Sequence, residues 1–176
     1  KGLETGANNV FMITTSQRSK FIAQNSENDR IIKPFILGEG INPFSIKWDE
    51  KWLLFIPWHF PFHESKKDNE IQQAEQRFKQ QFPEIYVYLE HFKNELEKRA
   101  PSEKGHYEWY ALKRFAASYY RFFSEPKIMW QELAAYGKFA WDPIGYFPGN
   151  SAYMITKCPS ALTIILNSNV VDFYFG

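Results

Sequence analysis

The period of the hydrophobic residues changes near residue 70, and this change restricts the fold more than any other feature of the sequence. From Ile71 to Phe82 apolar residues recur at intervals of three or four, which is the spacing of one helix face. Pro83 follows where a second helix can begin, and Glu95 and Arg99 stand four apart on the outer face of that helix. We therefore expect a helical pair over residues 70–100. The apolar stripe of the second helix comprises Ile85, Tyr88, Leu89, Phe92 and Leu96.

Short apolar runs, each interrupted or bounded by glycine or proline, flank this pair and are typical of strands. Before the pair, residues 5–15 predict a turn and a short strand, and the polar stretch 16–30 predicts a loop. WLLFIP (52–57) predicts a strand that forms a hairpin with a strand ending near Trp48. Beyond the pair, strands are predicted in EPKIMWQEL, GKFAWD and SAYMIT, with a turn in GYFPGN. Helical spacing returns at the end of the chain, in Leu162, Ile165, Leu166, Val170 and Phe173.

The order of these elements differs from alternating βαβ units and predicts an α+β fold. We expect mixed, mostly antiparallel strands, a central helical pair and a C-terminal helix. The chain has 176 residues, 44% of them hydrophobic, which is sufficient for one core. We expect a single domain over residues 1–176 with a helical insertion at about 70–100. Because the sequence begins without Met, we interpret it as a piece of a longer protein.

Charge and cysteine content restrict the partners and the compartment. The formal net charge is +1, so binding of nucleic acid would depend on a local basic patch rather than on a basic field over the whole molecule. The single cysteine, Cys158, excludes an internal disulfide framework and favours a cytoplasmic location. The most apolar run, at 52–62, contains two prolines and is shorter than the ~20 residues of a membrane span. We therefore expect no membrane partner.

Motifs for cofactor chemistry do not occur in this sequence. Amino methyltransferases use an Asn/Asp-Pro-Pro-Tyr/Phe loop, whereas the triplets at 42–44 and 142–144 lack the second proline. Glycine-rich phosphate loops and dinucleotide fingerprints are also absent. We therefore expect no catalytic residue and no cofactor within this sequence.

Metal chemistry has only weak candidates. Asp49 with Glu64 and Lys66 loosely matches the acidic pattern of metal-dependent nucleases. His59 and His63 stand four apart, but Pro61 between them prevents the helix that would bring both rings to one face. We expect no metal ligand here and interpret both patterns as loop residues.

The stretch GHYEWYALKRFAASYYRFF (105–123) places Lys113 and Arg114 among many large rings. In one interpretation the rings pack in a core and the two charges lie at its solvated edge. In the other, the stretch forms a surface that binds a flat or anionic ligand. The residues alone leave both interpretations open.

A series of stretches, in order along nearly the whole chain, resembles the TaqI-like C-terminal specificity domain, the target-recognition domain of DNA adenine methyltransferases and fused type II restriction-modification enzymes. These stretches are TGANNVFMIT, IIKPFILGEGI, WLLFIPWHFP, FPEIYVYLEHFKNELEKR, YEWYALKR, PKIMWQELA, KFAWD, SAYMIT and ILNSNVVDFYF.

The resemblance implies a binding role without catalysis. In this family an upstream domain binds S-adenosylmethionine and methylates adenine at N6, and a fused nuclease domain, where present, uses Mg²⁺. The domain resembled here docks on double-stranded DNA and recognises its sequence. We therefore expect two partners, namely double-stranded DNA and an upstream methyltransferase domain of the same chain. Because members recognise different sequences, the resemblance carries over the fold but not the base contacts.

Candidate DNA contacts follow from the chemistry of DNA recognition, in which cations meet phosphates and forked donors or acceptors meet base edges. Arg114 could contact phosphate or guanine, Gln131 and Asn150 could pair with adenine, and Glu132 could accept from cytosine. Each of these residues could instead face solvent or shape a turn. The candidates are Arg18 and Lys20 in the predicted loop, Lys33, Lys113, Arg114, Lys127, Gln131, Lys138 and Asn150.

Two rival functions remain at this point. The first is an aromatic-rich module that binds protein or carbohydrate through its rings. The second is a small metal-dependent nuclease built on Asp49, Glu64 and Lys66.

Overall fold

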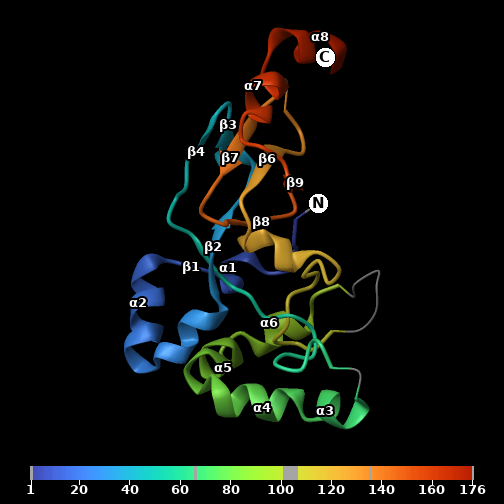
Figure 1. Ribbon diagram of the computed structural model, residues 1–176. Helices are drawn as coiled ribbons and strands as arrows, with labels where there is room; N and C mark the ends of the chain where they lie inside the picture. The colour runs from blue at the N-terminus through green and yellow to red at the C-terminus, as the bar shows by residue number, and fades with distance from the viewer. Residues whose placement is uncertain (1, 66, 101–106, 135, 176) are drawn as a thin grey trace. The chain divides into compact units, whose positions relative to one another are not determined.

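The structure is a computed structural model that describes residues 2–65, 67–100, 107–134 and 136–175. The chain forms two compact units, shown in Figure 1. The sheet unit comprises Lys1–Leu3, Pro34–Lys51 and Ser118–Gly176, and the helical unit comprises Glu4–Lys33 and Trp52–Ala117. The expected single domain with an insertion at about 70–100 stays a prediction.

A three-stranded antiparallel sheet of β6 (Lys127–Gln131), β7 (Phe139–Asp142) and β9 (Ala152–Thr156) dominates the sheet unit, with β6 in the middle. Trp130 lies opposite Phe139 in β7 and opposite Tyr153 in β9. All three strands fall within the stretches where the sequence predicts them. Burial alternates along β7, whereas the first three residues of β6 are all buried, as expected for a central strand covered on both faces at that end.

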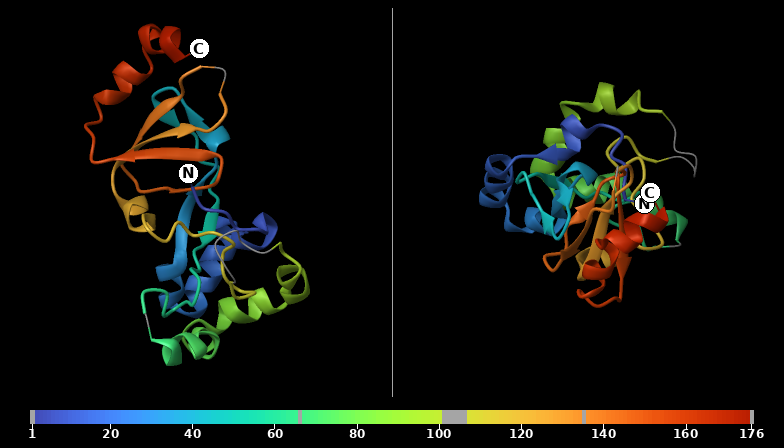
Figure 2. Two further views of the ribbon diagram at one scale, coloured as in Figure 1. Left: turned by 90° about the vertical axis from the view of Figure 1, so that its right-hand side faces the viewer. Right: turned by 90° about the horizontal axis from the view of Figure 1, so that it is seen from above.

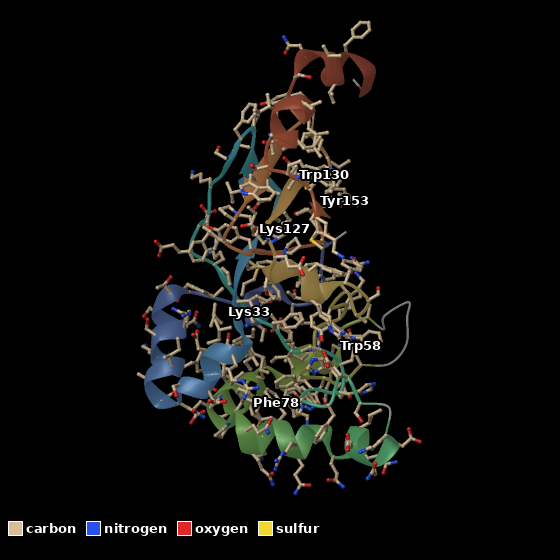
Figure 3. The ribbon with its side chains drawn as sticks, viewed as in Figure 1. Lys33, Trp58, Phe78, Lys127, Trp130 and Tyr153 are labelled. Atoms are coloured by element: carbon tan, nitrogen blue, oxygen red, sulfur yellow. The ribbon has the colours of Figure 1, made fainter. Side chains whose placement is uncertain are left out.

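One face of this sheet forms the core of the unit. Met129, Ala140 and Ala152 point into a buried cluster with Ile36, Ile41 and Tyr146. The hairpin of β3 (Ile41–Asn42) and β4 (Ser45–Ile46) packs beside this sheet, as two views show (Figures 1 and 2). The opposite face carries rings: Trp130 and Tyr153, both labelled in Figure 3, stack with ring centroids 5.5 Å apart.

The remaining elements of the sheet unit border these strands. The last residues of β2 (Ile32–Ile36) pair in parallel with β8 (Phe147–Pro148). The 3₁₀ helix η2 (Gly38–Gly40) connects β2 to β3, and the 3₁₀ helix η3 (Tyr120–Ser124) precedes β6. The C-terminal helices are α7 (Leu162–Leu166) and α8 (Asn169–Phe175). Asn167 between them binds both the N–H and the carbonyl of Phe139, which fixes the end of α7 at β7. The apolar helix face that the sequence predicts over residues 162–173 is only partly buried, since Ile165, Val170 and Phe173 are exposed.

The helical unit is built around α3 (Asp68–Gln72), α4 (Ala74–Gln81), α5 (Pro83–Glu90) and α6 (Lys93–Glu97). Phe78 is fully buried and contacts Phe60, Phe82, Tyr86 and Tyr110 through their rings. The second helix that the sequence predicts is interrupted by a turn at His91 and Phe92, which separates α5 from α6. Pro83 occupies its first turn, as the sequence predicts.

Helix α2 (Thr15–Gln24) replaces the loop that the sequence predicts over residues 16–30. Thr14 accepts from the N–H of Gln17, and the Gln17 side chain accepts from the N–H of Thr14, which forms a complete capping box. The 3₁₀ helix η1 (Ser26–Ile31) follows and has Asn25 as its cap. The polar sequence thus forms a surface helix that its cap stabilises.

The predicted hairpin between WLLFIP and the strand before it is wrong. β5 (Trp52–Leu54) lies instead between β1 (Met12–Ile13) and β2, while β4 pairs with β3. The short strand β1 follows a single turn of helix, α1 (Asn8–Phe11). Pairing partners distant in sequence carry no local signal, and this accounts for the error.

The outward pair of Glu95 and Arg99 is also not formed as the sequence predicts. Arg99 lies beyond the end of α6, and its guanidinium turns inward onto backbone carbonyl groups. Glu95 accepts from the Asn9 side chain instead. The hydrogen bonds to these carbonyls compensate the guanidinium of Arg99 for its desolvation. A single exposed ion pair with Glu95 would contribute little by comparison.

These elements confirm the α+β class with mostly antiparallel strands, a helical pair and a C-terminal helix. Within the described ranges, every helix is too short or too polar for a bilayer crossing.

Candidate nucleic-acid interface

Three of the nine candidate residues meet at one end of the three-stranded sheet. Gln131 ends β6 and pairs with Ala152 in β9. Because Trp130 pairs with Phe139, continuing the register places Gln131 opposite Lys138. Asn150 lies in the turn that leads into β9 and is exposed. We call the group of Gln131, Lys138 and Asn150 the Gln131 end.

Backbone contacts hold the Gln131 end in place. The N–H of Glu132 donates to the Ser151 carbonyl at 2.8 Å, and the N–H of Gly38 donates to the Ser151 hydroxyl at 2.9 Å. A Cβ at Gly38 would lie 2.2 Å from the Ser151 carbonyl oxygen, so this close approach of two backbones requires glycine. The turn carrying Asn150 is therefore fixed beside the end of β6.

The side chains of the Gln131 end are of mixed character rather than strongly basic. The Lys138 ammonium lies 5.3 Å from the centre of the Tyr136 ring. The Tyr153 hydroxyl donates to Glu132 at 3.2 Å. An amide fork, a cation and a carboxylate within a few residues provide the donors and acceptors that contact base edges and phosphates.

Lys127 lies at the opposite end of β6 and is fully buried. Its ammonium donates to Asp142 and to the Phe123 carbonyl, both at 2.5 Å (Figure 3). Burial lowers its pKa, and the Asp142 carboxylate opposes that shift. An ammonium enclosed in this way cannot reach a phosphate, so Lys127 is left out of the DNA contacts proposed below.

Lys113 and Arg114 lie in the helical unit and share an acidic partner. The Lys113 ammonium lies 2.7 Å from one Glu4 oxygen, and the Arg114 guanidinium lies 3.7 Å from the other. The backbones of Glu4 and Arg114 also exchange two hydrogen bonds. These two cations are therefore partly neutralised, and a phosphate would have to compete with Glu4.

The three remaining candidates also belong to the helical unit. Arg18 lies on α2 rather than in a loop, with its guanidinium 4.0 Å from the Trp52 ring centre and 2.8 Å from Asp29. Lys20 is exposed on the same helix. Lys33 is half-buried in β2, and burial lowers its pKa although Asp29 opposes the shift. Lys20 thus presents its charge to solvent, whereas Arg18 and Lys33 are engaged by their neighbours.

The rings of residues 107–123 largely support the core interpretation. Tyr110, Phe115 and Phe123 are buried, and Trp109 donates from its indole to Glu75 at 2.8 Å. Desolvation raises the pKa of Tyr110 well above its usual value. The charges in this stretch therefore border packed rings.

In the described part of the chain, no group of three or more His, Cys, Asp or Glu side chains is arranged to hold a metal ion. His59 Nδ1 lies 2.5 Å from Glu108, and the His63 ring stacks on Phe60. Lys66 lies outside the described residues.

Exposed apolar side chains near the Gln131 end escape prediction from sequence. Leu133 and Tyr136, in the segment between β6 and β7, are exposed, as is Phe44 in the β3–β4 turn. For Phe44 the sequence does contain a signal. Proline at position 43, between two short apolar runs, is typical of a turn, and a turn would expose Phe44.

Comparisons with known proteins agree with one another. The sequence model of one protein family, the TaqI-like C-terminal specificity domain, matches residues 33–176. The type II methyltransferase M.MjaIV of Methanocaldococcus jannaschii is 27% identical over 115 residues, which cover 65% of this chain and 33% of that protein. The Type IIL restriction-modification enzyme MmeI, solved in complex with DNA, matches with a TM-score of 0.58 and 14% identity over 95% of this chain and 20% of its own. This chain thus spans a third of the first relative and a fifth of the second.

Proposed function

The chain belongs to the TaqI-like C-terminal specificity domain family, and from this membership we infer that it recognises a specific sequence in double-stranded DNA. It is a specificity domain of the restriction-modification type and is related to DNA methyltransferases. The recognition it performs would position the duplex for methylation by another domain of the same protein.

The observation that carries this proposal is the Gln131 end. Two amide residues and a lysine from three segments have their backbone positions at this end of the sheet, although they are 7 to 19 positions apart in sequence. A glutamine or asparagine can pair with adenine through two hydrogen bonds, and lysine can bind a phosphate or guanine. Lys20, Lys113 and Arg114 are further candidates for phosphate contacts.

The reaction we propose for the whole protein is transfer of a methyl group to the N6 amino group of adenine. S-adenosylmethionine would supply that group in an upstream domain, and Mg²⁺ would act only if a nuclease domain is fused. The residues described here would bind and orient the duplex. Their contribution is register and sequence selection, without contact to the reacting atoms.

The test uses the full-length protein that carries this sequence. It is expressed in cells that lack adenine methylation, and the methylated adenines of the genome are mapped by single-molecule sequencing. We expect one methylated motif for the unchanged protein. Gln131→Ala should relax the motif at one base-pair position, because a good bidentate pair discriminates by about 1–3 kcal/mol.

Gln76→Ala is the matched control, since Gln76 is an exposed glutamine on α4. It should leave the motif unchanged. An unchanged motif in Gln131→Ala would remove Gln131 from the contacts. Absence of site-specific methylation by the unchanged full-length protein would overturn the proposed function. Salt-insensitive binding to a protein or carbohydrate would then favour the aromatic-rich module.

A further inference from the structure

Phe44 occupies a backbone conformation that a phenylalanine disfavours. Asn42 pairs with Ser45, so the β3–β4 hairpin is closed by the two residues Pro43 and Phe44. The φ angle of Phe44 is +60°, in the left-handed region. Proline followed by a residue with positive φ is the arrangement of a type II turn, whose second central position usually holds glycine or asparagine. A bulky residue there is an outlier.

Burial of the Phe44 side chain offsets little of this backbone strain, because the residue is 59% exposed. The turn is held from outside, since the N–H of Phe44 donates to the Phe139 carbonyl at 2.9 Å. That carbonyl also accepts from Asn167. Strained residues persist where the surroundings fix them, and they concentrate at functional sites. The conformation therefore indicates a role for the exposed ring.

The position of Phe44 points to the same end of the sheet as the proposed DNA contacts. Its hydrogen-bond partner, Phe139, is the first residue of β7 and directly follows Lys138. The turn of the cyan hairpin in Figure 1 thus adjoins the Gln131 end. Leu133, 82% exposed, belongs to the segment that joins β6 to β7 and begins at this end. An apolar ring accordingly accompanies the amide and ammonium groups.

We propose that Phe44 is a wedge that packs its ring against the bases at one step of the bound duplex. This inference rests on the proposed function and specifies how the same surface engages DNA. Apolar side chains inserted at a base step partly unstack it, and they favour a bent duplex that contacts more of the protein. An aromatic ring is suited to this because every base presents a face on which it can stack.

The experiment uses the full-length protein and duplexes that carry 2-aminopurine at successive positions of the methylated motif and its flanks. The fluorescence of 2-aminopurine rises when neighbouring bases no longer stack on it. The unchanged protein should raise the signal at the target adenine and at one further step. Phe44→Asn should abolish only the second signal and weaken binding by about tenfold or more, which is the loss expected for one ring–base contact.

Phe44→Asn also separates the wedge from a merely structural role. Asparagine tolerates positive φ, so this variant should melt at the same temperature as the unchanged protein or at a higher one. Weaker DNA binding combined with equal or greater stability is an outcome that misfolding would not produce. Phe44→Trp should retain both the second signal and the affinity.

Ile144→Asn is the matched control, because Ile144 is 64% exposed and follows Asp142 at the opposite end of β7. It should change neither signal. Unchanged affinity and an unchanged second signal in Phe44→Asn, with site-specific methylation intact, would overturn the wedge and leave the proposed function standing. If the unchanged protein does not methylate a specific site, that result would instead overturn the proposed function.

Discussion

At the scale of single residues, Lys127 and Asp142 form an ion pair in which both side chains are fully buried. Asp142 also accepts from the N–H groups of Ile144, Gly145 and Tyr146, at 2.8 to 3.0 Å. The carboxylate therefore fixes both the lysine and the turn after β7. Breaking such a pair leaves an uncompensated charge inside the protein, whereas replacing both members can be nearly neutral.

We expect Lys127→Met to lower the free energy of unfolding by about 3 kcal/mol, measured by urea unfolding. Lys127→Met with Asp142→Asn should lose less than the sum of the two single changes, because the two groups interact directly. Lys47→Met, an exposed lysine of the same unit, should have little effect. Equal losses for Lys127→Met and Lys47→Met would contradict the structural role of the pair.

At the scale of elements, Arg99 joins the end of α6 to segments distant in sequence. Its guanidinium donates to the carbonyls of Thr5, Trp109 and Ala111 at 2.5 to 2.9 Å, and its Nε donates to Leu96. We expect Arg99→Met to destabilise the protein by about 3 kcal/mol, because several buried carbonyls lose their donor. Arg77→Met on the exposed face of α4 should leave the urea midpoint nearly unchanged. Similar midpoints for both variants would refute this function of Arg99.

The elements also show what sequence can and cannot predict. The strands around Met129, Ala140 and Ala152 are predictable because each is a short apolar run bounded by turn-forming residues. Helix α2 is missed because its apolar stripe is weak, although Thr14 and Gln17 carried the cap signal. Partner strands, the inward turn of Arg99 and the burial of Lys127 depend on residues far along the chain. The convergence at the Gln131 end depends on register, which a single strand pattern does not contain.

At the scale of the whole molecule, the 176 residues of this sequence carry a formal net charge of +1, so this domain would add little long-range attraction to DNA. The DNA binding that we propose would then depend on a small number of local phosphate contacts. Each such contact contributes about −0.9 to the slope of log affinity against log salt concentration, because it releases condensed counterions. For the full-length protein on its own motif, the slope would therefore give the number of phosphate contacts that lysines and arginines of the whole protein make.

We expect Lys138→Gln to reduce the magnitude of that slope by about 0.9 and to weaken binding to all sequences alike, as loss of one phosphate contact requires. Lys98→Gln removes the same charge from an exposed position after α6 and should leave the slope unchanged. Comparing the two separates a local contact from the effect of net charge. If both variants reduced the slope equally, the attraction would be a property of total charge, and Lys138 would have no distinct contact with the DNA backbone.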